Sequence, residues 1–148
     1  MRGWGTLAAG VMLATGCSPN PRNEMPAIAA AALADMASTD PGRHLCVGRT
    51  IAPWRPAAEA GRYDPPAPPG YAGLYDTGFR GGGGLKGASV GGVPVSGRPG
   101  CIDLRGPLVS GDRAMVEAHL GDASLNDWLK RTDGDWRVVM TTSSTYRH

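Results

Sequence analysis

The chain has 148 residues, with 15 lysines and arginines against 13 aspartates and glutamates, for a formal net charge of +2. This near balance gives no reason to expect binding to nucleic acid or to an acidic membrane face. The length suffices for one domain of ordinary size but not for two.

The first residues have the three-part order of an export signal. Arg2 supplies a positive start, Leu7 to Leu13 form a short apolar run, and Ala14-Thr15-Gly16 are small residues before Cys17. The apolar run is too short for a transmembrane helix, which needs about 20 apolar residues. We therefore expect residues 1–16 to be a cleaved signal.

The stretch Leu13-Ala14-Thr15-Gly16-Cys17 resembles the lipobox of bacterial lipoproteins, with Leu13 one place earlier than the usual pattern. The resemblance implies that Cys17 becomes the first mature residue and carries the lipid (palmitate among its acyl chains), and that the protein faces the periplasm. It also implies, from Ser18 rather than Asp after the cysteine, the outer membrane more than the inner. A plain cleaved signal and an uncut anchor are the alternatives.

Without residues 1–16, and thus without Arg2, the chain keeps 14 basic and 13 acidic residues. Two cysteines then remain, Cys46 and Cys101, and in an exported chain a disulfide between them is the default expectation. The bridge would close a loop of about 55 residues, worth roughly 4 kcal/mol in the chain-entropy model. A metal site or a reactive thiol is the alternative, although no second ligand pair has zinc spacing.

The mature chain is expected to be a 17–23 tether followed by a single domain, 24–148. A helix is predicted from Glu24 to Ala37, with Asn23 as a plausible N-cap and Pro26 in the first turn. Its apolar stripe, which we expect to pack on a sheet, comprises Met25, Ile28, Ala29, Ala32, Leu33 and Met36. A short strand is predicted over His44–Ile51.

The segment Arg62–Gly100 is rich in proline and glycine and poor in large apolar residues. Such a segment cannot bury enough surface to offset its backbone entropy, so we expect a flexible insertion at 62–100.

Strand patterns fill the rest of the chain. They cover Cys101–Val109 (interrupted at Gly106-Pro107), Arg113–Leu120, Ser124–Thr132 and Asp135–Thr142, and Asp133-Gly134 is a strong hairpin signal. Pairing across that turn would set Leu129 opposite Val138, Arg131 opposite Trp136 and Trp128 opposite Val139. A helical alternative remains for 114–120 and 124–131. The predicted fold class is α+β, with one N-terminal helix on a small antiparallel β-meander.

Three short motifs resemble catalytic or nucleotide-binding signatures, but each lacks its context. Gly87-Ala88-Ser89-Val90-Gly91 has no large α/β sheet, Asp76-Thr77-Gly78 occurs once, and the glycines of 82–87 follow no strand. The three histidines are scattered, with His119 among exposed alternates of its strand. We therefore predict no catalytic residue, metal or cofactor.

The possible binding surface comprises Tyr71, Tyr75, Trp128, Arg131 and Trp136, because aromatic side chains and arginine dominate binding energies. Arg131 and Trp136 are expected to form a cation–π contact. The expected function is a non-catalytic structural or partner-binding module of the cell envelope. The alternative is a small envelope enzyme or ligand carrier, with residues 62–100 closing over the sheet.

Overall fold

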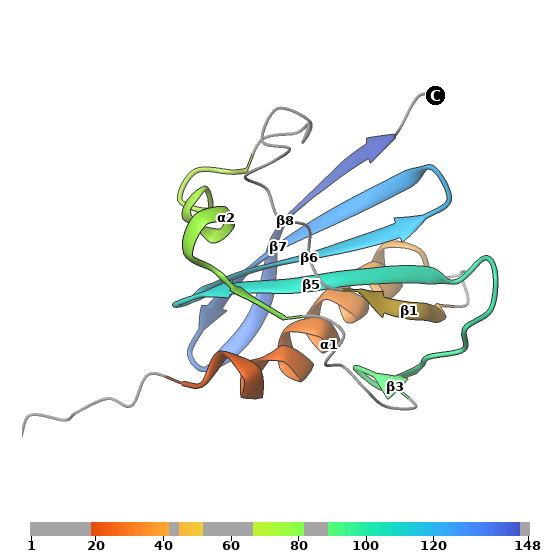
Figure 1. Cartoon of the computed structure of the whole chain (residues 1–148), viewed down its shortest axis with the longest axis horizontal. Helices are drawn as coiled ribbons and strands as arrows, with labels where there is room; N and C mark the ends of the chain where they lie inside the picture. The colour runs from red at the N-terminus through yellow and green to blue at the C-terminus, as the bar shows by residue number, and fades with distance from the viewer. Residues whose placement is uncertain (1–18, 42–44, 52–66, 82–88, 146–148) are drawn as a thin grey trace, which may run out of the picture.

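The structure is a computed structural model that describes residues 19–41, 45–51, 67–81 and 89–145. Its elements are α1 (Pro21–Thr39), β1 (Val47–Ile51), α2 (Gly73–Thr77), β2 (Phe79–Arg80), β3 (Ser89–Val90), β4 (Val93–Pro94), β5 (Ile102–Ser110), β6 (Arg113–Leu120), β7 (Ala123–Thr132) and β8 (Asp135–Thr145). The long helix lies across one face of the sheet (Figure 1). The α+β class is confirmed. The predicted signal, Cys17 and Ser18 lie outside the described residues.

The main sheet has the order β1-β5-β6-β7-β8, and β2 pairs with β5 beyond the end of β1. Strands β5 to β8 form the predicted antiparallel meander. The sheet is nevertheless mixed, because β1 runs parallel to β5 and pairs Val47 with Ile102. A parallel neighbour needs a long crossover connection, and nothing in the local pattern of β1 indicates its direction.

Helix α1 begins one turn earlier than predicted. The Asn20 side chain caps it by accepting a hydrogen bond from the Arg22 amide (3.0 Å), and Pro21 occupies the first turn, where a proline costs no hydrogen bond. Asn23 is therefore not the cap, Pro26 lies inside the helix, and residues 21–23 of the predicted tether are helical.

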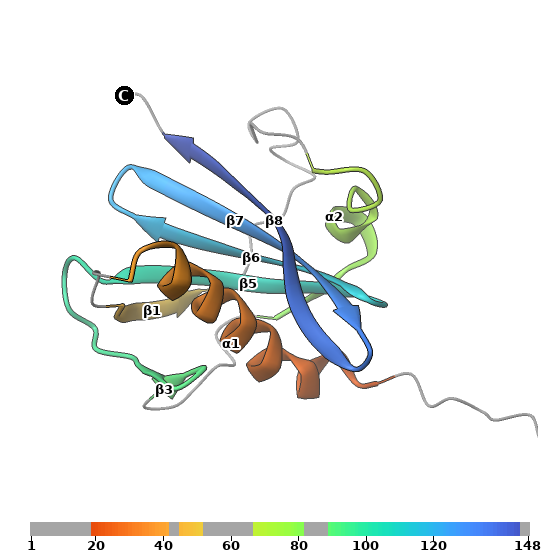
Figure 2. The same cartoon turned by 180° about the vertical axis from the view of Figure 1, so that it is seen from behind.

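The predicted stripe of α1 is its buried face. Met25, Ile28, Ala29, Ala32 and Leu33 are buried, and Met36 packs beside them. They meet one face of the sheet, formed by Val47, Leu104, Val116 and Leu129 among others (Figure 2). Each large side chain buried in this way contributes about 1.5–3 kcal/mol, so this layer is the main core of the domain.

The interruption predicted at Gly106-Pro107 does not end the strand. The peptide bond between them is cis, and the register between β5 and β6 shifts between Arg105 and Leu108. Gly106 has φ +105°, and a Cβ there would lie 3.2 Å from the Met115 carbonyl oxygen. Glycine is required here because the chain passes close to its neighbour in the left-handed region.

The final hairpin forms as predicted, with Asp133 (φ 54°) and Gly134 (φ 89°) in its turn. Leu129 pairs with Val138 and Arg131 with Trp136, as expected. The pairing of Trp128 with Val139 is wrong: a register shift leaves Val139 out of the ladder, and Trp128 pairs with Met140. The helical alternatives for 114–120 and 124–131 are wrong as well.

The described parts of the predicted insertion contain secondary structure. The segment that contains α2 packs on the face of the sheet opposite α1, where Tyr71 is 5% and Leu74 2% exposed, whereas β2 pairs with β5 within the sheet. The β3–β4 hairpin lies against α1 and buries Val90. Tyr71, Tyr75 and Leu74 supply the buried apolar area that the composition of the segment did not suggest. Residues 62–66 and 82–88 lie outside the described part of the chain.

Candidate functional site

Cys46 and Cys101 are joined by a disulfide, as predicted. It links the residue before β1 to the residue before β5, and the Ile102 amide donates to the Cys46 carbonyl beside it (3.0 Å). The bridge therefore fixes the start of the parallel pair.

Three of the five residues of the predicted binding surface form an aromatic cluster on the α2 side of the sheet. The Tyr71 and Tyr75 rings meet Trp128 edge to face, at centroid distances of 5.5 Å and 6.2 Å. Trp128 is fully buried, and its indole donates to the Thr142 hydroxyl (3.1 Å). The Tyr71 hydroxyl donates to the Leu129 carbonyl (3.1 Å). Trp128 and Tyr71 are thus core residues and offer no contact area to a partner.

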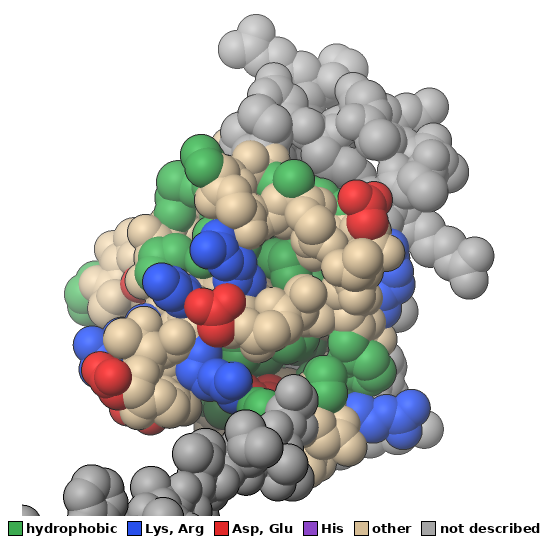
Figure 3. Space-filling view, turned by 90° about the vertical axis from the view of Figure 1, so that its left-hand side faces the viewer, with side chains coloured by type: hydrophobic (Ala, Val, Ile, Leu, Met, Phe, Trp, Pro, Cys, Tyr) green, Lys and Arg blue, Asp and Glu red, His purple; other side chains and the backbone are tan. Residues whose placement is uncertain are grey.

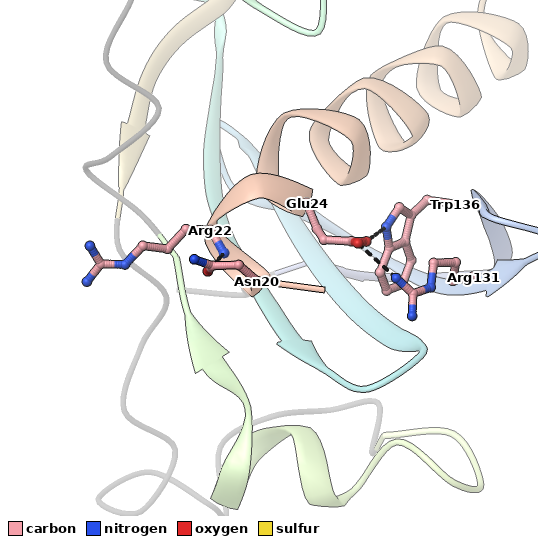
Figure 4. Close-up of polar contacts among 5 residues, drawn as sticks. All are labelled: Asn20, Arg22, Glu24, Arg131 and Trp136. Carbon is pink, nitrogen blue, oxygen red and sulfur yellow. Dashed lines mark hydrogen bonds and ion pairs between the residues drawn. The ribbon is translucent and has the colours of Figure 1, made fainter. Parts of the chain in front are cut away.

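The other two, Arg131 and Trp136, lie on the opposite face, toward α1. The Arg131 guanidinium lies over the Trp136 ring (5.8 Å), which is the predicted cation–π contact. Glu24 of α1 is the third member of this contact, which the sequence did not predict. Its carboxylate accepts from Arg131 Nη1 (2.8 Å) and from the Trp136 indole (Figure 4). A pocket of about 360 Å³ opens beside this triad. Its lining residues are Pro19, Asn20, Pro21, Glu24, Val109, Gly111 and Arg131.

A row of polar side chains crosses the α2-side face next to the aromatic cluster. The strand registers align Arg105 of β5, Glu117 of β6, Asn126 of β7 and Thr142 of β8. Glu117 and Asn126 are buried, at 5% and 9% exposure. Side chains directly opposite on neighbouring strands lie about 5 Å apart, so this row is a continuous polar band.

His119 belongs to this polar band rather than to an exposed face. Its Nε2 lies 2.6 Å from Glu117 Oε1, and its side chain is only 18% exposed. The expectation of an exposed alternate was wrong because both faces of β6 are covered, one by α1 and the other by the α2 segment. Burial raises the pKa of Tyr75, and the charge of the nearby Glu117 raises it further.

Asp127 is a second buried acid, on the α1 side. It is fully buried; one carboxylate oxygen accepts from the Thr141 hydroxyl (2.8 Å), and the other has no hydrogen-bond partner. Burial raises its pKa to about 6, the Thr141 bond opposes this rise, and the Asp35 charge adds to it. An unsatisfied buried oxygen is costly.

The motif residues that the structure describes lie in ordinary structural settings, and the glycines of 82–87 lie outside the described residues. Thr77 and Gly78 bond back to the carbonyls of Gly73 and Leu74, so Asp76-Thr77-Gly78 is the end of α2. Ser89 is an exposed residue of the short β3–β4 hairpin. Within the described ranges, no group of three or more His, Cys, Asp or Glu side chains could hold a metal ion. Over the same ranges, no helix has the length and apolar character needed to cross a membrane.

The outer edge of β8 is the most exposed apolar part of the described structure. Within the described structure, the exposed large hydrophobic residues all lie on the hairpin of β7 and β8: Leu125 (37%), Val139 (55%) and Met140 (37%). The order of the sheet places β8 at its edge, next to β7 alone. From Val138 to Thr145 this strand contains neither a charged residue nor a proline.

Comparison with known proteins finds no matching family model, no similar curated protein and no similar solved structure. The function must therefore be argued from the residues and their arrangement.

Proposed function

We propose that this protein is an exported lipoprotein whose folded domain is a non-catalytic partner-binding module of the cell envelope. The observation that carries the proposal is the Leu13–Cys17 stretch, which ends an apolar run too short to span a bilayer. The Cys46–Cys101 disulfide supports it, because such bonds persist in oxidising compartments. Lipid on Cys17 would hold the domain at a membrane that faces the periplasm, the outer membrane in preference to the inner.

The anchor is tested by the intact mass of the protein purified from bacterial membranes. The expected species begins at Cys17 and carries a thioether-linked diacylglycerol and an amide-linked acyl chain. Cys17→Ala is expected to leave the precursor unprocessed or the product unacylated. A mature species of unmodified mass would contradict the anchor.

The surface proposed for the partner is the open edge of β8. Natural sheets protect such edges with charges, prolines or bulges. Here the bulge at Val139 is followed by six uncharged residues, Met140–Thr145, that lack further protection. An extended segment of an envelope protein can add a strand to this edge, and Val139 and Met140 would then contact its side chains. The aromatic cluster supports this role only indirectly, by holding β7 in place beneath β8.

Crosslinking in intact cells tests this surface. A photo-crosslinking residue at Met140, which is 37% exposed, is expected to capture an envelope protein. Val139→Lys with Ser143→Lys, which places charges on the edge, is expected to abolish the capture. The matched control is Ala27→Lys with Ala37→Lys, two exposed positions of α1. Equal capture by both pairs of variants would contradict binding at β8.

A second candidate, a small envelope enzyme or ligand carrier, is favoured by the polar band. Residues 67–75 pack against Trp128 on the face that also carries Glu117 and His119, an acid–base pair 2.6 Å apart. An imidazole held by a buried carboxylate is a common general base. Native mass spectrometry with fragments of envelope polymers and lipids would detect a bound ligand. His119→Gln should then remove it, while Ser89→Ala should not.

A further inference from the structure

The strand registers place three cations side by side on the face away from α1. Arg113 of β6 pairs with Lys130 of β7, and Lys130 pairs with Arg137 of β8. Like charges directly opposite on neighbouring strands are destabilising. The row of three cationic side chains therefore destabilises the fold locally unless an anion lies between them.

The existing acidic neighbours offset only one end of this row. Asp112 lies 3.7 Å from Arg113, whose guanidinium also lies over the Tyr71 ring at 5.0 Å. Lys130 and Arg137 are exposed and form no ion pair among the described residues. The space-filling view of this end shows Lys and Arg side chains gathered around one acidic side chain (Figure 3).

The same end of the sheet adjoins the start of the described chain. Pro19 and Asn20 share a pocket with Gly111, in the β5–β6 turn, and with Arg131, next to Lys130. Cys17 precedes Pro19 by two residues, which span at most about 7 Å when extended. A lipid on Cys17 would therefore bring the headgroups of a bilayer to this end of the domain.

We infer that Arg113, Lys130 and Arg137 bind the phosphate groups of anionic phospholipids and so orient the domain on the membrane. The inference rests on the proposed anchor, which supplies the bilayer at the right end of the domain. The phosphate would relieve the like-charge row, and the long side chains would reach it while the sheet stands with its β7–β8 turn toward the membrane. Asp133 and Asp135 at that turn limit the attraction, so the row orients the domain and adds little to the anchor.

Lys130 can be followed individually, because the only other lysine of the chain is Lys86. The lipidated protein is reconstituted into vesicles of phosphatidylcholine alone or with phosphatidylglycerol, and acetylation of each lysine is followed by mass spectrometry. Lys130 is expected to react about fivefold more slowly on the anionic vesicles, the size expected for one cation near such a surface. High salt should remove the difference.

Arg137→Gln tests the row without disturbing the packing of Arg113 on Tyr71, and it is expected to weaken the protection of Lys130. Arg98→Gln, at another exposed arginine, should leave the protection intact. Equal rates for Lys130 on both vesicles would overturn the inference. If the intact mass shows no lipid, the anchor fails by itself. Flotation of the unlipidated chain with anionic vesicles, with and without Arg137→Gln, then tests separately whether the cationic row binds the membrane.

Discussion

Two carboxylates on the α1 side of the sheet, the partly buried Glu24 and the fully buried Asp127, differ in how well their oxygens are satisfied. Glu24 gives one oxygen to Arg131 and the other to Trp136. Asp127 uses one oxygen for Thr141 and leaves the other without a partner. Glu24 therefore stabilises the packing of α1 on the last hairpin, whereas ionised Asp127 opposes folding.

Asp127→Asn is expected to stabilise the protein at pH 7.5. The pKa of Asp127 is about 6 in the folded state, above its ordinary value of 3.8, so the folded state binds the proton more tightly. The stability gained from this tighter proton binding is fully present below pH 4 and is lost as the pH rises through 6. The unfolding free energy of Asp127→Asn at pH 7.5 should therefore exceed that of the parent by at most ~3 kcal/mol. Urea unfolding of both proteins at pH 4.5, 6 and 7.5 measures it.

The sign of that pH dependence provides the check. The gap in unfolding free energy between Asp127→Asn and the parent should widen from pH 4.5 to 7.5. Asp133→Asn, an exposed turn residue whose φ of 54° asparagine tolerates, should show no such widening. A gap that is constant or shrinks would mean that Asp127 stays ionised throughout.

Removing the Glu24 carboxylate is expected to destabilise the domain. Glu24→Gln should lower the unfolding free energy by about 1–2 kcal/mol, because charged hydrogen bonds to partly buried donors are lost. A double-mutant cycle with Arg131→Gln should give a coupling energy of about 1 kcal/mol. Additive effects in chemical denaturation would show that the 2.8 Å pair contributes nothing of its own.

At the scale of elements, local signals in the sequence predicted most of the main layer. The apolar spacing of α1, the alternation of β6 and the Asp133-Gly134 turn each act over a few residues, and each predicted the right structure. The cysteine pair was predictable from the compartment that the N-terminus suggests. Where the errors fall within these elements, they are small, such as the extra turn at Asn20 and the bulge at Val139.

The remaining features depend on contacts between distant residues and could not be predicted. The parallel pairing of β1 depends on the path of the whole chain to β5. Tyr71 and Leu74 sit in a segment whose composition resembles a linker, and only the sheet face that they cover makes them core. His119 meets Glu117 two residues away, yet its burial depends on the cover over that face. The strand registers, rather than any motif, reveal the polar band and the cationic row.

Leu74→Ala tests whether α2 is an integral part of the fold. Leu74 is 2% exposed against Trp128 and Leu108. Its truncation should cost about 2–4 kcal/mol, the usual range for a buried leucine. Asp76→Asn, at an exposed site of the same helix, should stay within about 0.5 kcal/mol. If Leu74→Ala behaved like the control in chemical denaturation, α2 would be a loosely attached segment.

At the scale of the whole molecule, the disulfide closes a loop of 55 residues that contains α2 and the β3–β4 hairpin. Its removal by Cys46→Ser with Cys101→Ser should lower the unfolding free energy by about 4 kcal/mol in the chain-entropy model. Chemical denaturation of the parent with and without reductant measures the same quantity. A parent that is indifferent to reductant would show that the loop is held by packing alone.

The contact of Glu24 with Arg131 and Trp136 joins the beginning of the described chain to its last hairpin. The first helix of the described chain thus has partners more than a hundred residues later. The sheet that α1 covers is complete only when β8, its last strand, has been made. The main core of the domain therefore closes late in synthesis, as the export proposed for the chain would require.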